Sequence, residues 1–246
     1  MSRSAPGPQS YGREYYRQAY GLDEMRRFSI HWWSARFYAL LARRVLRRAG
    51  GRRVLEVGCG HGYTLARLER EFETFGIDLS EYAVGRAREI APRSRVFEAD
   101  LLGELPEEVA GGGFDLVLAK YVLEHLPQPQ RALERIRGLL SPTGRLLYSV
   151  PDTTSPSRRF RGDQWYALLD ETHVSLLDPP EWLELTRQSG FSIERVFSDG
   201  IWDMPWFPRL PVLPQYALFC LPTMLAVGLA RPILPAGWGE NLIVVA

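Results

Sequence analysis

Short apolar runs alternate with helix-patterned stretches through the first part of the chain, and this alternation constrains the fold more than any other feature. The strand-like runs occupy 52–58, 73–78, 95–100, 114–119 and 144–150, and helical patterns at 63–71, 80–90 and 128–140 lie between them. Strands joined through helices are parallel neighbours connected by crossovers, with helices on both faces of the sheet. The alternation therefore predicts an α/β fold with a doubly wound, mainly parallel sheet.

The pattern differs on either side of this region. Residues 1–12 are rich in Ser, Pro and Gly and predict a flexible tail, and 13–50 predict a helical N-terminal cap with its main helix over 22–48. After Pro151 we expect a polar, aromatic insertion at 151–178, a helix ending at Gly190, a strand at 191–197, an apolar insertion at 199–239 and a last strand at 241–246. The expectation is one domain, 1–246, built on a seven-stranded sheet and divided into halves 51–150 and 151–246.

Charge and cysteine content bound the class of ligand and the compartment. The chain has 30 Lys and Arg against 29 Asp and Glu, so nothing in the totals attracts a polyanion, and we expect no nucleic-acid partner. Cys59 and Cys220 lie far apart without zinc-site spacing, and the first residues lack the apolar core of a secretory signal. These features favour a cytoplasmic protein that acts on a small or uncharged substrate.

The segment 210–230 carries no charge over 21 residues and lies between Arg209 and Arg231. Its length approaches the ~20 residues of a membrane-spanning helix, but Pro222 is expected to break a helix in its middle. We favour a buried or substrate-covering lid over a membrane-surface contact, and a membrane span least. A homodimer interface would use the same residues and stays open as well.

The stretch VLEVGCGHGYT, residues 54–64, is a glycine loop between a strand and a helical pattern. A dinucleotide loop needs a third glycine where this chain has Tyr63, and Glu56 would place a carboxylate near the pyrophosphate that a helix N-terminus attracts. A nicotinamide-dependent oxidoreductase or epimerase, the alternative that shares this architecture, is therefore disfavoured. The loop favours a ligand that bears positive charge.

Two aspartates follow later strands. Asp78 ends its strand 20 residues after Gly58, the spacing at which a carboxylate accepts hydrogen bonds from ribose hydroxyls. Asp100, after the third strand, is placed to meet an exocyclic amine on a base. Either residue alone is as typical of a cap or a turn. Their order and spacing together predict a nucleoside without phosphates.

These residues resemble the motifs of class I S-adenosylmethionine-dependent methyltransferases. The loop Glu56-Val-Gly58-Cys-Gly60-His-Gly62, the two aspartates, EHL at 124–126 and SPTG at 141–144 fall where that family has its motifs. Over about 51–198 the chain is similar to ubiquinone and menaquinone biosynthesis methyltransferases and related small-molecule O-methyltransferases. The resemblance implies a Rossmann-like methyltransferase fold, S-adenosyl-L-methionine as cofactor, and methyl transfer to a small-molecule, glycan or lipid-linked acceptor, with a hydroxyl favoured. A non-catalytic cofactor-binding module is not excluded.

The resemblance also implies a role for each matching position. Gly58, Gly60 and Gly62 would line the methionyl part, and Glu56 would hold its ammonium group. The remaining cofactor contacts would come from Asp78 to the ribose, Leu79 to the adenine face, Asp100 and Leu101 to the adenine edge, and the Lys120 backbone near the sulfonium. Cys59 and His61 are then variable loop positions, and no metal is expected.

Histidine is the natural base for a hydroxyl acceptor. His173 lies in the aromatic insertion and is our candidate general base, or the residue that orients the acceptor; the alternative is a turn residue bonded to a backbone carbonyl. His125, in the EHL motif, fits an active-site role and a structural hydrogen bond equally well. Tyr15, Tyr16 and Tyr20 form either a lid over the cofactor or a packing cluster, and Trp202 or Trp206 would stack on an apolar or sugar acceptor.

Overall fold

The computed structural model describes residues 7, 11–20, 25, 27–202, 207, 209–229 and 234–246, with only the backbone at 18–20, 222, 223 and 228. Most of the predicted tail, 1–12, and Trp206 lie outside these residues. The strands are β1 Arg53–Val57, β2 Glu73–Asp78, β3 Arg95–Glu98, β4 Phe114–Lys120, β5 Leu140–Pro151, β6 Arg195–Ser198 and β7 Asn241–Val245. The helices are α1 Arg13–Tyr20, α2 Ile30–Ala49, α3 Leu65–Leu68, α4 Glu81–Ile90, α5 Glu107–Ala110, η2 Leu123–His125, α6 Pro129–Leu139, α7 Pro156–Arg161, η3 Gly162–Gln164, α8 Tyr166–Leu169, α9 Pro179–Gln188 and α10 Val212–Gly228.

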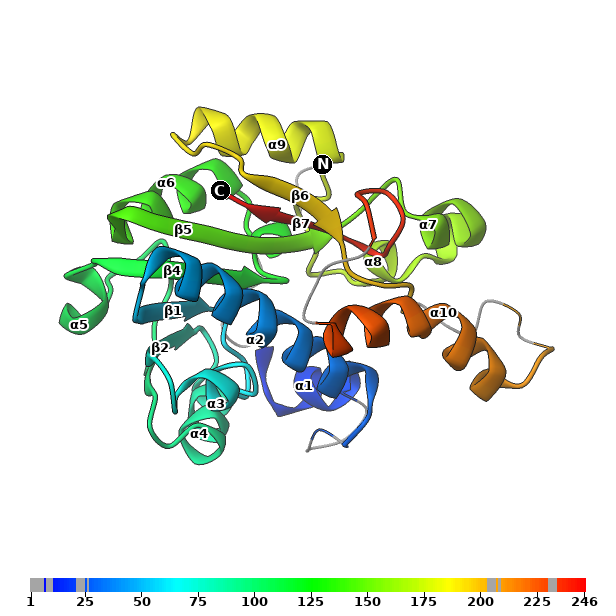
Figure 1. Ribbon diagram of the computed structural model, residues 1–246, viewed down its shortest axis with the longest axis horizontal. Coiled ribbons are helices and arrows are strands. Elements are labelled where there is room, and N and C mark those ends of the chain that lie inside the picture. The colour runs from blue at the N-terminus through cyan, green and yellow to red at the C-terminus, as the bar shows by residue number, and fades with distance from the viewer. Residues whose placement is uncertain are drawn as a thin grey trace.

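The strands form one seven-stranded sheet in the order β3-β2-β1-β4-β5-β7-β6 (Figure 1). β1 to β5 pair in parallel, whereas β7 runs antiparallel between β5 and β6. The predicted α/β fold with a doubly wound, mainly parallel sheet is confirmed. The strand order reverses between β1 and β4, the place where open sheets of this kind bind ligands.

Helices cover both faces of the sheet and bury two halves of the core. α2 packs on one face with α3 and α10, where Leu46 and Leu68 meet the β4 residue Leu118. On the other face, α6 and α9 bring Ile136 and Trp182 onto the β5 residue Tyr148. Since both faces are covered, the strands are almost continuously apolar, as in other parallel sheets.

Local sequence sets the ends of α2. The Ser29 side chain accepts a hydrogen bond from the Trp32 amide, and Gly50 ends the helix in the left-handed region at φ 66°. The predicted helix over 22–48 thus begins later, at Ile30, because Ser29 caps it and Phe28 takes a φ of 67° that does not continue a helix. The predicted helix over 63–71 is likewise shorter, with regular α-helix only at Leu65–Leu68.

The two insertions contain helices that the sequence pattern did not predict. α7, η3 and α8 lie within 151–178, and α10 continues through position 222, so the expected break at Pro222 is wrong. A proline in a helix costs roughly 3 kcal/mol, and the contacts of α10 with α2 offset that cost. No helix among the described residues is both long and apolar enough to cross a membrane.

Candidate active site

A cavity of about 950 Å³ opens at the carboxyl ends of the parallel strands, where the strand order reverses. Its walls come from the glycine loop, from the segments that follow β2, β3 and β4, and from α1, α2 and the 151–178 insertion. All predicted site residues except Glu56 and Gly62 line it. Gly62 lies behind the loop, where an added Cβ would come within 3.0 Å of Ala87 in α4.

The backbone conformation of the glycine loop favours glycine at positions 58 and 60. Gly58 has φ 63°, and a Cβ there would lie 2.4 Å from the Val122 side chain. Gly60 has φ 51°, and its amide donates a 2.8 Å hydrogen bond to Asp78. Both positions favour glycine because other residues strain in the left-handed region. The loop therefore approaches the β4 segment closely and turns an amide toward the end of β2.

Asp78 is held in place by donors from three segments. Its carboxylate accepts hydrogen bonds from the amides of Gly60 and Ser80 and, at 3.3 Å, from the Tyr16 hydroxyl of α1. Burial raises the pKa of this carboxyl above its usual value, and the bonded amides counter the shift. A fixed, buried acceptor at this position suits a hydroxyl pair on a ligand.

Glu56 lies below the loop, on β1, with 2% of its surface exposed. Its Oε2 has no hydrogen-bond partner among the described residues. Burial raises the pKa of Glu56 to about 7, and the Lys120 charge acts in the opposite direction. Burial also lowers the pKa of Lys120, whose ammonium lies 5.6 Å from the Tyr38 ring centre. A buried carboxylate with an unused oxygen fits a cationic group better than an anionic one.

The residues predicted to contact adenine follow two strands: Leu79 comes directly after β2, and Asp100 and Leu101 come after β3. Leu79 and Leu101 line the cavity and supply an apolar surface. Asp100 is exposed and accepts a hydrogen bond from the Leu102 amide at 2.9 Å. Its carboxylate thus shapes the turn after β3 and still borders the cavity.

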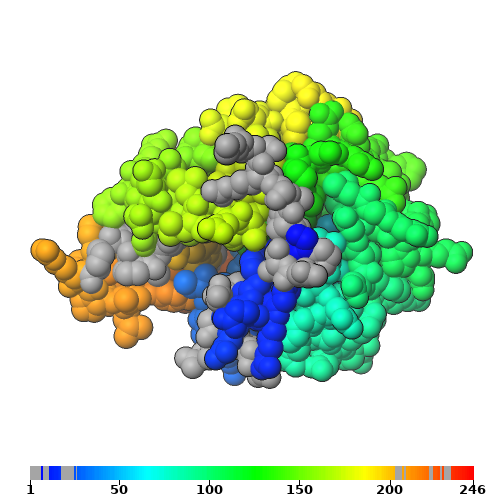
Figure 2. All heavy atoms as spheres, turned by 180° about the vertical axis from the view of Figure 1, so that it is seen from behind, coloured from blue at the N-terminus to red at the C-terminus, as the bar shows by residue number. Residues whose placement is uncertain are grey.

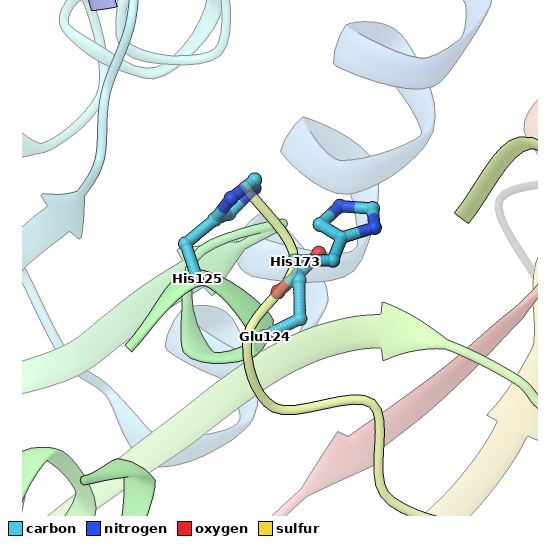
Figure 3. A group of neighbouring side chains, drawn as sticks. All are labelled: Glu124, His125 and His173. Carbon is cyan, nitrogen blue, oxygen red and sulfur yellow. The ribbon is translucent and has the colours of Figure 1, made fainter. Parts of the chain in front are cut away.

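His125 and His173 come together from segments 48 residues apart, and Glu124 lies beside them (Figure 3). The two imidazole centres are 4.7 Å apart. His173 Nδ1 lies 2.8 Å from the Ala167 carbonyl oxygen, and His125 Nδ1 lies 3.2 Å from that of Thr172. Since a carbonyl only accepts, each Nδ1 carries the proton and each Nε2 keeps its lone pair.

Burial of this cluster favours neutral imidazoles. Burial lowers the pKa of His125 to about 4, helped by the nearby His173, and burial also lowers the pKa of His173. Asp170 Oδ2, 3.7 Å from His173 Nε2, acts against that shift. Burial raises the pKa of Glu124 to about 8, and neither carboxyl oxygen has a hydrogen-bond partner among the described residues. The ligand atoms of the three residues lie within 4.8 Å of one another, so the group is able to share a proton or to hold a metal ion.

Helix α1 closes one side of the cavity. Tyr11, Tyr15 and Tyr16 line it, and Figure 2 shows their segment in blue, between the first half of the chain and the 151–178 insertion. Tyr15 and Tyr16 border the cavity, a position open to a lid and to a packing cluster alike, and the side chain of Tyr20 lies outside the described residues. Sequence reasoning missed Tyr11, although it belongs to the same tyrosine-rich stretch.

Further cavity residues had no signal in the sequence. Tyr121, Tyr166 and Asn241 come from three distant segments and form a hydrogen-bonded set, with Asn241 donating to Tyr121 at 3.1 Å and accepting from Tyr166 at 3.0 Å. Asp199 accepts from the Asn241 side chain behind them at 2.6 Å. Trp202 also lines the cavity, as its aromatic surroundings suggested.

Comparison with known proteins identifies the family of this chain. The methyltransferase-domain family matches residues 30–196. The chain belongs to this family. A probable S-adenosylmethionine-dependent methyltransferase of Mycolicibacterium smegmatis is 31% identical over 169 residues, which span 67% of this chain and 61% of that relative. A ubiquinone biosynthesis O-methyltransferase of Xylella fastidiosa is 32% identical, over 82% of this chain and 89% of that protein.

Solved structures agree on the fold of this methyltransferase. The magnesium protoporphyrin IX methyltransferase of Synechocystis PCC 6803, solved with bound SAH, superposes with a TM-score of 0.60 at 16% identity, covering 94% of this chain and 92% of that one. The methyltransferase is an enzyme of the class I, Rossmann-like group, and its cofactor is S-adenosyl-L-methionine. The oxidoreductase alternative does not hold. The residues present fit this cofactor, because Asp78 lines the cavity as an acceptor for hydroxyls and, behind the glycine loop, Glu56 Oε2 has no hydrogen-bond partner among the described residues.

Proposed function

We propose that this methyltransferase transfers a methyl group from S-adenosyl-L-methionine to a hydroxyl of a small-molecule, glycan or lipid-linked acceptor. One observation carries the proposal: a single cavity is lined both by the cofactor residues Gly58 and Asp78 and by His173, whose Nε2 keeps its lone pair. The O-methyltransferase activity named for relatives in ubiquinone biosynthesis supports the choice of oxygen.

The cofactor would be held by the residues that the resemblance indicates. We propose that Gly58 and Gly60 receive the methionyl part, that Glu56 attracts its ammonium group from behind the loop, and that Asp78 binds the ribose. Leu79 and Leu101 would pack on the adenine, with Asp100 at its edge. The bound cofactor supplies an electrophilic methyl on a positively charged sulfur.

His173 takes the proton of the acceptor hydroxyl in this proposal. The acceptor oxygen would form the new O–CH₃ bond as the C–S bond breaks, with S-adenosylhomocysteine as the leaving group, and the hydroxyl proton would pass to Nε2 of His173. The Nδ1 bond to Ala167 fixes the ring in the required tautomer. Asp170, at 3.7 Å from Nε2, stabilises the imidazolium that results. His125 positions this group through its Nδ1 bonds to Thr172.

The test begins with a screen of hydroxylated acceptors using a tritiated methyl donor. With a substrate in hand, His173→Ala is expected to lower kcat by roughly 10²–10⁴-fold, the range of general base catalysis, with cofactor affinity unchanged. Glu171→Ala, at the exposed neighbouring position, is the matched control and keeps full activity. An unchanged kcat in His173→Ala would remove the proposed base.

The same assay tests the expectation that no metal takes part. Activity is expected to survive dialysis against EDTA, since proton transfer to His173 needs none. A loss of activity that Mg²⁺ or Mn²⁺ restores would assign Glu124, His125 and His173 to a metal site instead.

We also propose a cytoplasmic location, in line with two cysteines that are both buried and free.

A further inference from the structure

Helix α10 buries a polar side chain and exposes apolar ones. Its polar residue Gln215 is buried, and the amide nitrogen donates to the carbonyl oxygens of Phe207 and Leu210 at 3.0 Å. The opposite side exposes leucines spaced by four or eight residues, which form one stripe along the helix and its C-cap: Leu213, Leu221, Leu225 and Leu229. Leu213 is 82% exposed. Water is a poor solvent for such a face, so an apolar partner is expected to cover it.

Segments next to α10 carry further exposed apolar side chains. Tyr216 of α10 donates a hydrogen bond to the Phe28 carbonyl, and the Phe160 and Phe207 rings lie 5.7 Å apart. We call the exposed leucines and Val212 of α10 and its ends the apolar face: Leu210, Val212, Leu213, Leu218, Leu221, Leu225 and Leu229. Phe28, Phe160 and Phe207 are exposed on the segments that adjoin this helix. Figure 1 shows α10 projecting from the body of the molecule next to α2. The predicted substrate-covering lid is wrong, because no described residue of 207–229 lines the cavity.

Charge identifies the kind of partner. Exposed arginines adjoin the apolar residues in sequence: Arg27 beside Phe28, Arg159 beside Phe160, and Arg209 beside Leu210. Residues 204–239 contain no Asp or Glu, and neither do residues 25–55. An apolar surface bordered by arginines matches an anionic lipid surface, which accepts leucine side chains between acyl chains and attracts the arginines to its headgroups.

A second copy of the chain fits less well. In a twofold dimer the same face meets itself, so the arginine borders of both copies approach each other with little acid between them. Repulsion between these arginines disfavours the dimer but does not oppose binding to an anionic lipid surface.

We propose that the apolar face docks this methyltransferase on an anionic membrane surface without spanning it. This inference rests on the proposed function for its consequence, since docking places the cavity at the lipid surface. Trp202 and Ile30 line the cavity, and Cys220 of α10 bonds to the Ile201 carbonyl, one residue before Trp202. The acceptor class that this arrangement favours is a lipid-linked hydroxyl compound.

Flotation with liposomes tests the docking. The wild type is expected to float with vesicles of equal parts phosphatidylcholine and phosphatidylglycerol, and at least ~10-fold less with phosphatidylcholine alone, because each arginine near an anionic surface contributes about 1 kcal/mol. Leu213→Ser/Leu221→Ser/Leu225→Ser and Arg159→Glu/Arg209→Glu should each lower binding to the anionic vesicles at least ~10-fold. Arg93→Glu/Arg131→Glu, at exposed positions on other elements, is the charge-matched control and floats like the wild type.

Cofactor binding by calorimetry separates this inference from the proposed function. If the wild type binds the cofactor but does not float with anionic vesicles, the docking proposal is wrong and the methyl-transfer proposal stands. Light scattering tests whether the apolar face instead binds a second copy of the chain. A wild-type dimer that the serine variant converts to a monomer would assign the apolar face to self-association. Failure to release S-adenosylhomocysteine with any acceptor, despite normal flotation, would count against the function alone.

Discussion

At the scale of single residues, burial decides what the polar groups of this site are able to do. Glu56, Asp78 and Glu124 are almost fully buried, yet their partners differ. Asp78 has three donors and keeps its charge in place, whereas Glu124 has no hydrogen-bond partner among the described residues for either oxygen. The same side-chain chemistry therefore gives a ready acceptor at one position and a proton reservoir at another.

Replacing Asp78 by Asn removes the charged acceptor that we assign to the ribose. A hydrogen bond to a charged group contributes about 1.5–3 kcal/mol, so cofactor affinity should fall by roughly 10–100-fold in calorimetry. Glu98→Gln, at the exposed end of β3, is the control and binds like the wild type. Equal affinity of Asp78→Asn and the wild type would place the ribose elsewhere.

Glu124 makes stability depend on pH. Burial raises its folded pKa to about 8, above the usual value of 4.5, so the folded state binds more protons and the free energy of unfolding falls as pH rises between these values. In the wild type this fall should amount to roughly 3–4 kcal/mol between pH 5 and 8 in urea titrations, and Glu124→Gln should remove most of it. Glu107→Gln, in α5, should keep the wild-type slope. A parallel slope for Glu124→Gln would contradict the raised pKa.

At the scale of elements, the close approach of the glycine loop to the segment after β4 shapes the cavity. Gly58 permits this contact because it has no Cβ, and its positive φ turns the chain from β1 toward α3. The motif spacing predicts a glycine here, but the reason differs from ligand contact alone, since Val122 occupies the space where a side chain would be.

Gly58→Ala should destabilise the fold by roughly 2–4 kcal/mol, from left-handed strain and the clash with Val122. The chain contains a matched control: Gly85, in α4, has open space around its missing Cβ. Gly85→Ala should instead stabilise by about 0.5–1 kcal/mol. Urea unfolding of both variants checks the contrast, which would fail if the two substitutions had equal effects.

At the scale of the whole molecule, the site joins two halves of the chain. The cavity is lined by the residues of 51–150 that we propose to bind the cofactor and by His173, Tyr166 and Asn241 of 151–246, with α1 at one side. A ligand that fills it therefore contacts elements from the N-terminus to the last strand, and binding should stabilise the entire fold.

Thermal unfolding measures this coupling. S-adenosyl-L-methionine at about 100 times its Kd should add about 2.7 kcal/mol, which raises Tm by about 5–10 °C for a chain of this length. NAD at the same concentration should leave Tm unchanged, because Glu56 and the spacing of the loop glycines disfavour a pyrophosphate. A comparable shift with NAD would overturn the assignment of loop specificity.

The sequence by itself determined the strand and helix alternation, the order of the halves and the cofactor motif, because periodicity and the glycine and aspartate spacing are local properties. β2 falls at the predicted 73–78, and Asp78 ends it. Local pattern failed at Pro222, where packing of α10 on α2 outweighs the cost of a proline in a helix. It also left open whether 210–230 turns its apolar side inward.

Only the tertiary structure brought His125 beside His173 and joined Tyr121, Tyr166 and Asn241 in one set. These contacts span 45 residues or more, and their geometry depends on how crossovers and loops pack rather than on any spacing along the chain. The exposure of the leucine stripe on α10 is likewise a result of packing, because a uniformly apolar sequence does not specify which side of its helix meets the core.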